Sequence, residues 1–363
     1  MKTAFTGNEA VAYAVKQIKP SVIAAYPITP TTQIMEELTQ YIADGDLRSQ
    51  LILSESEHSA ISSTLAASIS GSRVFTATSS QGLALMHEIL FVCSGLMAPI
   101  VMTVGARALS SPINIHNDHS DIMSERSTGW IQIFCETVQD AYDFTLFSYK
   151  LAENSKISLP IMVIMDGFIT THELTGIDLI EDSKINKFIG AFKKQSSLLN
   201  LKKPKTIGGF ALAGPYNEVK EEQDRRIKNV LKLFNTFSKE FNKISKRKLK
   251  MIEIYNNNAK NVFVAQASIC GTIRDSIKNN SKYGLVKINL FRPFPENKLK
   301  NILKTKKRII VIDRANEFDG IGGPLGKEVK AALYGENIKI ENHILGLGGK
   351  NISSYDIKKI QND

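Results

Sequence analysis

Threonine hydroxyls and prolines are combined at one turn near the start of the chain, in the run YPITPTT at residues 26–32. The run ends an apolar stretch and leads into a helical pattern. Its prolines fix φ and push the residues before them toward extended geometry, so the hydroxyls are presented from a stiff turn. A turn after a parallel strand is where open α/β sheets place small ligands. The alternative is that Thr31 or Thr32 only caps the following helix.

A carboxyl group begins a second helical pattern. Glu57 comes soon after the apolar residues 51–53, so its side chain could face a pocket at the sheet edge and donate or accept a proton. Glu55 and Glu57 are equally suited to a simpler role, a favourable interaction with the positive end of the helix, which contributes a few tenths to about 1 kcal/mol. The spacing by itself favours the simpler role.

An arginine follows the apolar run at residues 100–106. The planar guanidinium of Arg107 suits a carboxylate ligand, and an ion pair with Asp118 or Asp121 is the alternative. Residues 116–121 contain two histidines and two aspartates, which are potential metal ligands. No helix fixes the spacing of these side chains, and polar loop residues more often bond to the local backbone, so a metal site is not expected.

The elements that must position these groups alternate between strand-like and helical patterns. This alternation predicts an α/β fold with a mainly parallel sheet and helices on both faces. The expected strands are residues 22–26, 51–53, 74–78, 100–104, 130–134 and 161–165, and helices are expected to start near residues 7, 32, 57, 82 and 138. Because the carboxyl ends of parallel strands meet at one edge, we expect the turns at 26–32, 55–58, 78–82 and 107–121 to gather there.

The second part of the chain predicts a connector and a smaller domain. Apolar positions within residues 227–244 recur at helical spacing and indicate a long amphipathic helix. Beyond residue 261 the alternation resumes and predicts three or four further strands, at 262–265, 285–290, 309–312 and 338–344. We therefore expect two domains, residues 1–253, with a helical connector at about 206–253, and residues 254–363.

The composition is typical of a globular protein. Its 363 residues, 43% of them hydrophobic, are enough to bury sizeable cores. The apolar region 83–104 is interrupted by polar residues, glycine and proline, so we expect no membrane span. The N-terminus lacks the apolar block and cleavage site of a signal peptide, and the cytoplasm is the expected location.

Cysteine, lysine and glycine patterns exclude several kinds of site. Cys93, Cys135 and Cys270 are too far apart for an iron–sulfur motif and are expected to be small buried side chains. The net charge of +10 lies largely in lysine-rich stretches such as 193–205 and 245–250, without interleaved aromatics, which favours a solvated face over nucleic-acid binding. The glycine runs at 320–328 and 346–351 do not fit phosphate-binding motifs and are expected to serve turns and close packing.

Six longer motifs are specific enough to compare with known families. They are YPITPTT, SESEHSA, TATSSQGLALMHE, GARALSSPINIHNDHSDI, TGWIQIF and LFRPFP. From Gly7 to about Gly349 the chain resembles the α subunit of multi-subunit pyruvate:ferredoxin oxidoreductases. The resemblance implies a thiamine diphosphate enzyme in which this chain supplies the pyrimidine-binding domain and a transketolase-C-terminal-like domain. A β subunit would bind the diphosphate and Mg²⁺, and the sequence indeed contains no GDG followed by an Asn pair.

The resemblance also implies roles for individual residues. Glu57 matches the glutamate that bonds the pyrimidine ring nitrogen of the cofactor, and Pro27 and Ile28 belong to the same cofactor site. Thr29 and Arg107 match the residues that contact pyruvate, where a guanidinium can pair with the substrate carboxylate. With the resemblance in view, these roles outweigh the simpler interpretations of Thr29, Glu57 and Arg107.

The implied reaction is the oxidative decarboxylation of pyruvate to acetyl-CoA and CO₂ in a heterotetramer with β, γ and δ subunits. Coenzyme A is the implied co-substrate, and electrons would pass through iron–sulfur clusters on partner subunits to ferredoxin. One alternative is a subunit that acts on another 2-oxo acid, such as 2-oxoglutarate or a branched-chain oxo acid. A non-catalytic basic scaffold is the other alternative, against which the combination of Thr29, Glu57 and Arg107 argues.

Two positions depart from the family pattern. Residues 266–268, Gln-Ala-Ser, lack the usual Gly-Ser at the end of a strand, in a domain that we expect to be remote from the chemistry. Ser124 and Glu125 replace a small-hydrophobic pair before Arg126, which leaves the contacts of the substrate-side loop open.

Overall fold

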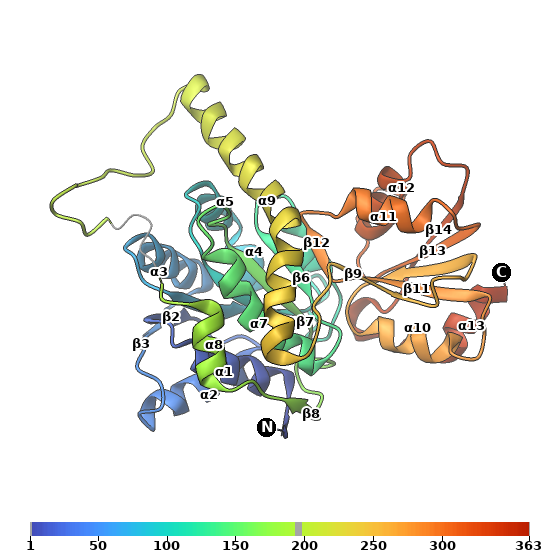
Figure 1. The fold of residues 1–363 in the computed structure, drawn as a ribbon, viewed down its shortest axis with the longest axis horizontal. Helices are drawn as coiled ribbons and strands as arrows, with labels where there is room; N and C mark the ends of the chain where they lie inside the picture. Colours follow the sequence, from blue (N-terminus) through green and yellow to red (C-terminus); the bar gives the residue numbers. More distant parts are fainter. Residues whose placement is uncertain (1, 193–197, 363) are drawn as a thin grey trace.

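A seven-stranded sheet forms the centre of the larger domain of the computed structural model, which describes residues 2–192 and 198–362 (Figure 1). The strand order is β12-β6-β7-β5-β4-β2-β3, and each neighbouring pair is parallel except β12 with β6. The strands are β2 (Val22–Ala25), β3 (Gln50–Leu53), β4 (Val74–Thr78), β5 (Val101–Ala106), β6 (Ile131–Phe134), β7 (Ile161–Asp166) and β12 (Leu290–Arg292). The predicted parallel α/β fold is confirmed.

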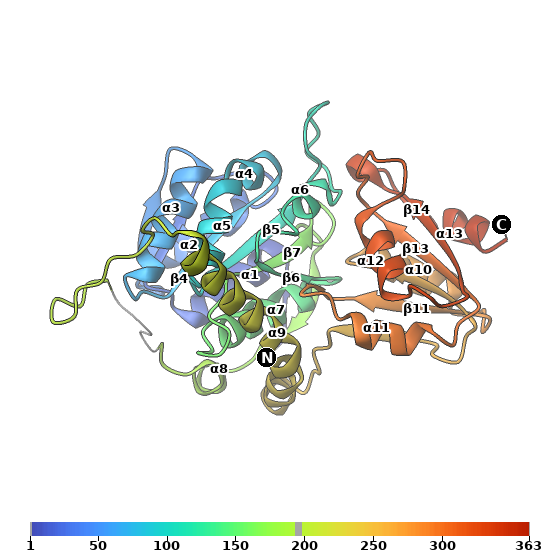
Figure 2. The same ribbon diagram turned by 90° about the horizontal axis from the view of Figure 1, so that it is seen from above.

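Helices cover both faces of this sheet, because each crossover between parallel strands places its helix on one face or the other (Figure 2). One face carries α1 (Gly7–Ile18), α2 (Thr32–Ala43), α7 (Val138–Ala152) and α8 (Asp182–Ile189). The other carries α3 (Glu57–Ile69), α4 (Ser80–Leu85), α5 (His87–Gly95) and the short α6 (Ser120–Ser124). The helix α6 begins within the predicted turn at 107–121 and extends three residues beyond it.

The smaller domain contains a sheet in the order β14-β13-β10-β11-β9, flanked by helices. Its strands are β9 (Ile252–Tyr255), β10 (Asn261–Ala265), β11 (Tyr283–Ile288), β13 (Arg308–Asp313) and β14 (Lys339–Ile344). The helices are α10 (Ile269–Ile277), α11 (Glu296–Leu303), α12 (Pro324–Ala332) and α13 (Ser354–Asn362). There are five strands rather than three or four, because β9 pairs antiparallel with β11. The domain limits at 253 and 254 stay a prediction.

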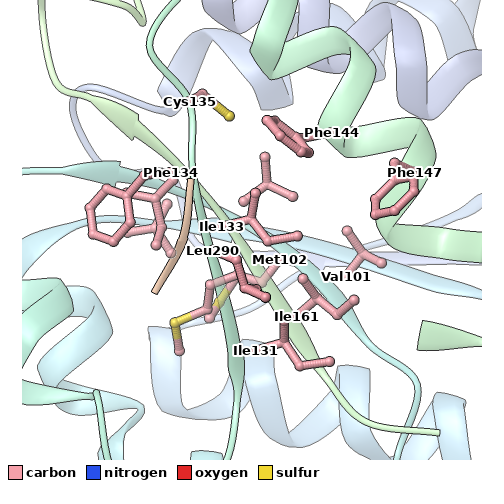
Figure 3. Close-up of a cluster of buried hydrophobic side chains, with 14 of the residues drawn as sticks. Val101, Met102, Ile131, Ile133, Phe134, Cys135, Phe144, Phe147, Ile161 and Leu290 are labelled. Atoms are coloured by element: carbon pink, nitrogen blue, oxygen red, sulfur yellow. The ribbon is translucent and has the colours of Figure 1, made fainter. Parts of the chain in front are cut away.

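The expected strand at 285–290 is divided between the two sheets. The strand β11 ends at Ile288, and Leu290 then pairs with Ile133 of β6 in the larger domain. Figure 3 shows Leu290 within the larger domain's core, together with side chains of β5, β6, β7 and α7. Both stretches are apolar, so sequence pattern could not separate them. This crossover attaches the smaller domain to the sheet that carries the candidate site.

A 33-residue helix, α9 (Ala213–Ser245), connects the domains. Its C-terminal half buries Val230, Phe234 and Phe241 against α7 and α8, as the apolar spacing predicts. The first turns of α9 project from the body of the protein (Figure 1), where a side-chain pair at helical spacing, Asn217 with Glu221 at 2.7 Å, supports the helix. The helix therefore begins earlier than the amphipathic pattern indicates, within the expected connector.

Several smaller elements carry no clear sequence signal. The strand β1 (Lys2–Phe5) pairs with β8 (Thr175–Asp178), and a 3₁₀ turn, η1, covers Leu347–Gly349. The three cysteines are buried and free, as expected. In the described part of the chain, no helix has both the length and the apolar character needed to cross a membrane. Of the lysine-rich stretch 193–205, residues 193–197 lie outside the described residues.

Candidate active site

The turns at the carboxyl edge of the larger sheet are joined by direct hydrogen bonds. Nη1 of Arg107, after β5, donates to the carbonyl oxygen of Thr29, after β2, at 3.0 Å. The backbone amide of Ser80, after β4, donates to Asp121 at 2.9 Å. The prediction that these turns gather at one edge is confirmed, because parallel neighbouring strands bring their ends together.

Asp121 is the centre of this assembly, a role that the sequence did not reveal. Its carboxylate is fully buried and accepts hydrogen bonds from the backbone amides of Ser80 at 2.9 Å, Arg107 at 3.0 Å and Ile122 at 2.7 Å. Burial raises the pKa of Asp121 to about 8, while the three amide donors act in the opposite direction. One side chain thus ties two turns to α6.

The guanidinium of Arg107 is held in a defined orientation. Only 6% of the residue is exposed, and Nε donates to the carbonyl oxygen of Asn114 at 2.9 Å, in addition to the bond from Nη1 to Thr29. Burial lowers the pKa of Arg107 and nearby Asp121 opposes this, but a guanidinium stays charged at neutral pH. Within residues 2–192 and 198–362, Nη2 has no hydrogen-bond partner. It is therefore available to an anionic ligand.

The alternative ion pair between Arg107 and Asp118 or Asp121 does not occur in the described structure. Asp121 accepts the backbone amide of Arg107 instead of its guanidinium. Asp118 accepts hydrogen bonds from Ser120 and from the backbone amide of Gly348. Arg107 consequently carries a buried positive charge without a carboxylate of the described residues in direct contact, an arrangement typical of an anion site.

The proline-rich turn presents Thr29 at the surface. Pro27 and Thr29 are exposed and Ile28 is half-buried. Thr31 is the residue before α2, yet its hydroxyl donates to the carbonyl oxygen of Ile28 at 3.0 Å and does not cap the helix. Gly105 allows this turn to approach β5, because a Cβ there would lie 2.8 Å from Cγ2 of Thr31. The capping interpretation is therefore wrong for the side chain of Thr31.

The structure separates the two glutamates that spacing could not distinguish. Glu55 is exposed and accepts a hydrogen bond from Oγ of Ser59 at 2.5 Å. Glu57, the first residue of α3, is only 7% exposed, and none of the described residues donates a hydrogen bond to its carboxylate. A buried carboxylate usually has a donor, so the environment of Glu57 fits a ligand that brings an N–H group.

Gly82 brings α4 close to this carboxylate. A Cβ at Gly82 would lie 2.5 Å from Oε1 of Glu57 and 2.7 Å from Oγ1 of Thr78. The hydroxyl of Thr78 is buried and has no partner among the described residues. Unmatched polar atoms beside Glu57 agree with a ligand site at the start of α3.

The histidines and aspartates of residues 116–121 are engaged in other contacts. No group of three or more histidine, cysteine or acidic side chains suited to a metal ion occurs in the described part of the chain. Nε2 of His119 lies 2.8 Å from Oδ1 of Asp166 at the end of β7. Asp166 also contacts Arg314 at 3.1 Å and the backbone amide of Ser268 at 3.0 Å. Ser268 and His119, at the end of the site loop, therefore meet at one carboxylate, because the end of β7 faces the smaller domain.

Asp166 is a buried carboxylate with compensating charges. Burial alone would raise its pKa, but Arg314 and His119 hold the pKa of Asp166 well below its usual range. A carboxylate whose folded-state pKa is depressed contributes stability above its unfolded pKa, and this contribution is lost as the pH falls through about 4 and below.

Asp166→Asn is therefore expected to lower the free energy of unfolding by about 2 kcal/mol at pH 7, because it leaves Arg314 without its counter-charge. Urea unfolding of both proteins between pH 7 and pH 3.5 measures this effect, and the difference should shrink at the acid end. Asp46→Asn, which removes an exposed pair with Lys16, is the control and should change stability by less than about 0.5 kcal/mol. A constant difference across the pH range would contradict the assignment.

Comparison with known proteins identifies the family of this chain. Residues 13–238 match the family model described as pyruvate flavodoxin/ferredoxin oxidoreductase, thiamine diphosphate-binding. The chain belongs to the pyruvate flavodoxin/ferredoxin oxidoreductase family. Residues 259–357 match core domain II of pyruvate:ferredoxin oxidoreductase. The 2-oxoacid:ferredoxin oxidoreductase class predicted from the motifs is confirmed.

Relatives within this family match over nearly their whole length. The pyruvate synthase subunit PorA of Thermotoga maritima is 44% identical, covering 100% of this chain and 94% of the relative. PorA of Methanocaldococcus jannaschii is 42% identical, covering 98% and 93%. The ketoisovalerate oxidoreductase subunit VorA of Pyrococcus horikoshii is 37% identical, covering 100% and 93%. The similarity to the pyruvate synthase subunits is therefore somewhat higher than to VorA.

Solved structures support the fold. A chain of 2-oxoglutarate:ferredoxin oxidoreductase from Magnetococcus marinus superposes with a TM-score of 0.78 at 18% identity, covering 99% of this chain. This chain spans 65% of that chain's length. A split-gene transketolase superposes with a TM-score of 0.57 at 10% identity, covering 99% of this chain and 97% of the other. The two-domain thiamine-enzyme fold expected for the family is confirmed.

Proposed function

We propose that this chain is the subunit of a pyruvate:ferredoxin oxidoreductase that holds the pyrimidine side of thiamine diphosphate and the carboxylate of pyruvate. The carboxylate of Glu57, nearly buried and without a donor among the described residues, carries the proposal. Arg107, with a nitrogen free for an anion, lies at the same edge of the sheet. Membership of a thiamine diphosphate-binding family supports assigning both groups to one active site.

Glu57 is the residue that holds the cofactor ring. Its carboxyl group would bond the pyrimidine ring nitrogen and keep a proton at that atom. The protonated nitrogen would then be the hydrogen-bond donor that Glu57 lacks among the described residues. Bound thiamine diphosphate supplies the nucleophilic carbon that cleaves 2-oxo acids next to the carbonyl group. Pro27 and Ile28, in the adjoining turn, would flank the ring.

Arg107 and Thr29 are the residues that hold the substrate. The guanidinium would pair with the carboxylate of pyruvate, and its orientation is set in advance by the carbonyl oxygens of Asn114 and Thr29. Thr29 is exposed at the same turn, so its hydroxyl can reach the oxo acid. A charged group fixed before binding loses little entropy when substrate arrives.

The rest of the enzyme would come from other chains. The sequence contains no GDG motif with a following Asn pair, which supports a β subunit as the holder of the diphosphate and Mg²⁺. We further propose γ and δ subunits with iron–sulfur clusters, coenzyme A as co-substrate, ferredoxin as electron acceptor and the cytoplasm as location. The spaced cysteines of this chain agree with clusters held elsewhere.

A branched-chain oxo acid is the second candidate substrate. The 37% identity to a ketoisovalerate oxidoreductase subunit supports it, although the pyruvate synthase subunits named above are more similar. The carboxylate contact of Arg107 is common to both substrates, so this residue does not distinguish them.

Activity of the assembled enzyme tests the proposal. We expect this chain, co-expressed with its β, γ and δ partners, to support coenzyme A-dependent reduction of a viologen dye with pyruvate. Activity with 2-oxoisovalerate and 2-oxoglutarate is expected to be at least about tenfold lower in kcat/KM, since a substrate pocket discriminates added methylenes by about 1–3 kcal/mol. The complex without this chain is the control. No activity with any oxo acid would overturn the proposal.

A further inference from the structure

The smaller domain forms hydrogen bonds with the loop that follows Arg107. Nδ2 of Asn114 donates to the carbonyl oxygen of Gly348 at 3.1 Å. The backbone amide of Gly348 donates to Asp118 at 3.2 Å, and that of Gly349 donates to the carbonyl oxygen of Asn117 at 2.6 Å. These three hydrogen bonds connect residues 114–118 to the turn at residues 346–349.

A second contact holds the end of the same loop. The backbone amide of His119 donates to the carbonyl oxygen of Arg314 at 2.8 Å, directly after β13. The side chains of the same two residues meet at Asp166. Residues 114–119 are therefore fixed at both ends by the smaller domain.

Two glycines make this close approach feasible. Gly348 and Gly349 have φ of +59° and +79°, in the region that favours glycine. A Cβ at Gly348 would lie 2.6 Å from Nδ2 of Asn114, and one at Gly349 would lie 2.4 Å from Cβ of His116. The glycine run that does not fit a phosphate motif thus serves to bring the smaller domain against the loop.

Asn114 connects the hydrogen bonds of the smaller domain to Arg107, the proposed substrate-binding residue. The side-chain amide of Asn114 donates to the carbonyl oxygen of Gly348, and the backbone carbonyl oxygen of Asn114 accepts the hydrogen bond from Nε of Arg107. The other bond that orients the guanidinium goes to Thr29 of the larger domain. One of the two bonds that fix Arg107 therefore depends on a loop that the smaller domain holds.

We propose that Asn114 and Gly348 are positioning residues through which the smaller domain sets the orientation of Arg107 for the substrate carboxylate. The inference rests on the proposed function of Arg107. Pairing between a guanidinium and a carboxylate depends on the plane of the guanidinium, so a tilt of Arg107 weakens substrate binding more than it affects the cofactor held at Glu57.

Two substitutions test this role. Asn114→Asp keeps the acceptor that bonds the amide of His116 at 2.6 Å but places an oxygen against the carbonyl of Gly348. Gly348→Ala places a methyl group against the same amide. In the complete enzyme, each is expected to raise KM for pyruvate about tenfold, with kcat and the affinity for thiamine diphosphate changed less than about twofold.

Gly335→Ala is the matched control. Gly335 also has a positive φ, +84°, but a Cβ there would meet nothing within 4 Å. Gly335→Ala should lower the melting temperature about as much as the backbone strain at Gly348→Ala does. It should leave KM for pyruvate unchanged. If Gly348→Ala does not fold, Asn114→Asp with its KM and kcat decides the matter.

The outcomes separate this inference from the proposed function. If Asn114→Asp leaves KM for pyruvate unchanged while Arg107→Lys raises it, the positioning role is wrong and the role of Arg107 stands. If Arg107→Lys also leaves KM for pyruvate unchanged, the proposed role of Arg107 is wrong, and the positioning role that rests on it is wrong as well. A fall in kcat and cofactor affinity equal to the rise in KM would mean a general loss of structure and would overturn the inference.

Discussion

Glu57→Gln is expected to lower kcat of the assembled enzyme by about 10²- to 10⁴-fold, the range that proton transfer by a positioned carboxyl group contributes. Glutamine has nearly the same size and can still accept a hydrogen bond, so the fold and the start of α3 should be preserved. What it loses is the ability to exchange a proton with the cofactor ring. Glu57 is only 7% exposed, so few other groups can approach the ring nitrogen in its place.

Glu55→Gln is the control for this prediction. Glu55 is two residues away, exposed and bonded to Ser59, so its replacement should change kcat less than about twofold. Steady-state assays with pyruvate, together with titration of thiamine diphosphate into each apoenzyme complex, measure both effects. Full turnover by Glu57→Gln would show that the assigned role is wrong.

Arg107→Ala is expected to raise KM for pyruvate by about 100-fold, because a charge-assisted contact to a carboxylate is worth about 3 kcal/mol in a buried site. Arg107→Lys keeps the charge but loses the planar geometry and the bond from Nε to Asn114, so an intermediate rise is expected. Binding of thiamine diphosphate should change little, since Glu57 is untouched.

Arg73→Lys provides a matched arginine control. Arg73 precedes β4, at the opposite edge of the sheet, and pairs with Glu153 at 2.6 Å. Its replacement should reduce stability without changing KM for pyruvate. Saturation curves for pyruvate with all three variants check the prediction, and an equal KM for Arg107→Ala and wild type would contradict it.

Much of the larger domain was predictable because its strands are buried on both faces. A continuous apolar run such as 161–165 is typical of a strand in a covered parallel sheet, and the structure places β7 there. The short strands β9 and β12 were not recognised as separate elements. Their pairing depends on contacts distant in the sequence, which three or four residues of local pattern do not specify.

The candidate site shows the same division. Thr29, Glu57 and Arg107 could be named because they follow predicted strands and match family motifs. The structural roles of Asp121 and Asp166 could not be predicted. Asp121 accepts backbone amides and Asp166 pairs with Arg314, and these partners meet the two carboxylates only in the folded chain. A hydrogen bond to a backbone amide does not depend on the identity of the residue that supplies it, so it leaves little trace in the sequence.

The sequence by itself determined the parallel sheet, the edge at which the candidate site lies and the family, because apolar periodicity and long motifs are local properties of the chain. Tertiary structure alone decided which glutamate is buried, that Arg107 forms no ion pair with the described residues, and that the smaller domain holds the loop after Arg107. The physical reason is that burial and hydrogen-bond partners are set by segments that are distant in the sequence: Arg107 and Thr29 are 78 positions apart, and Asn114 and Gly348 are 234 positions apart.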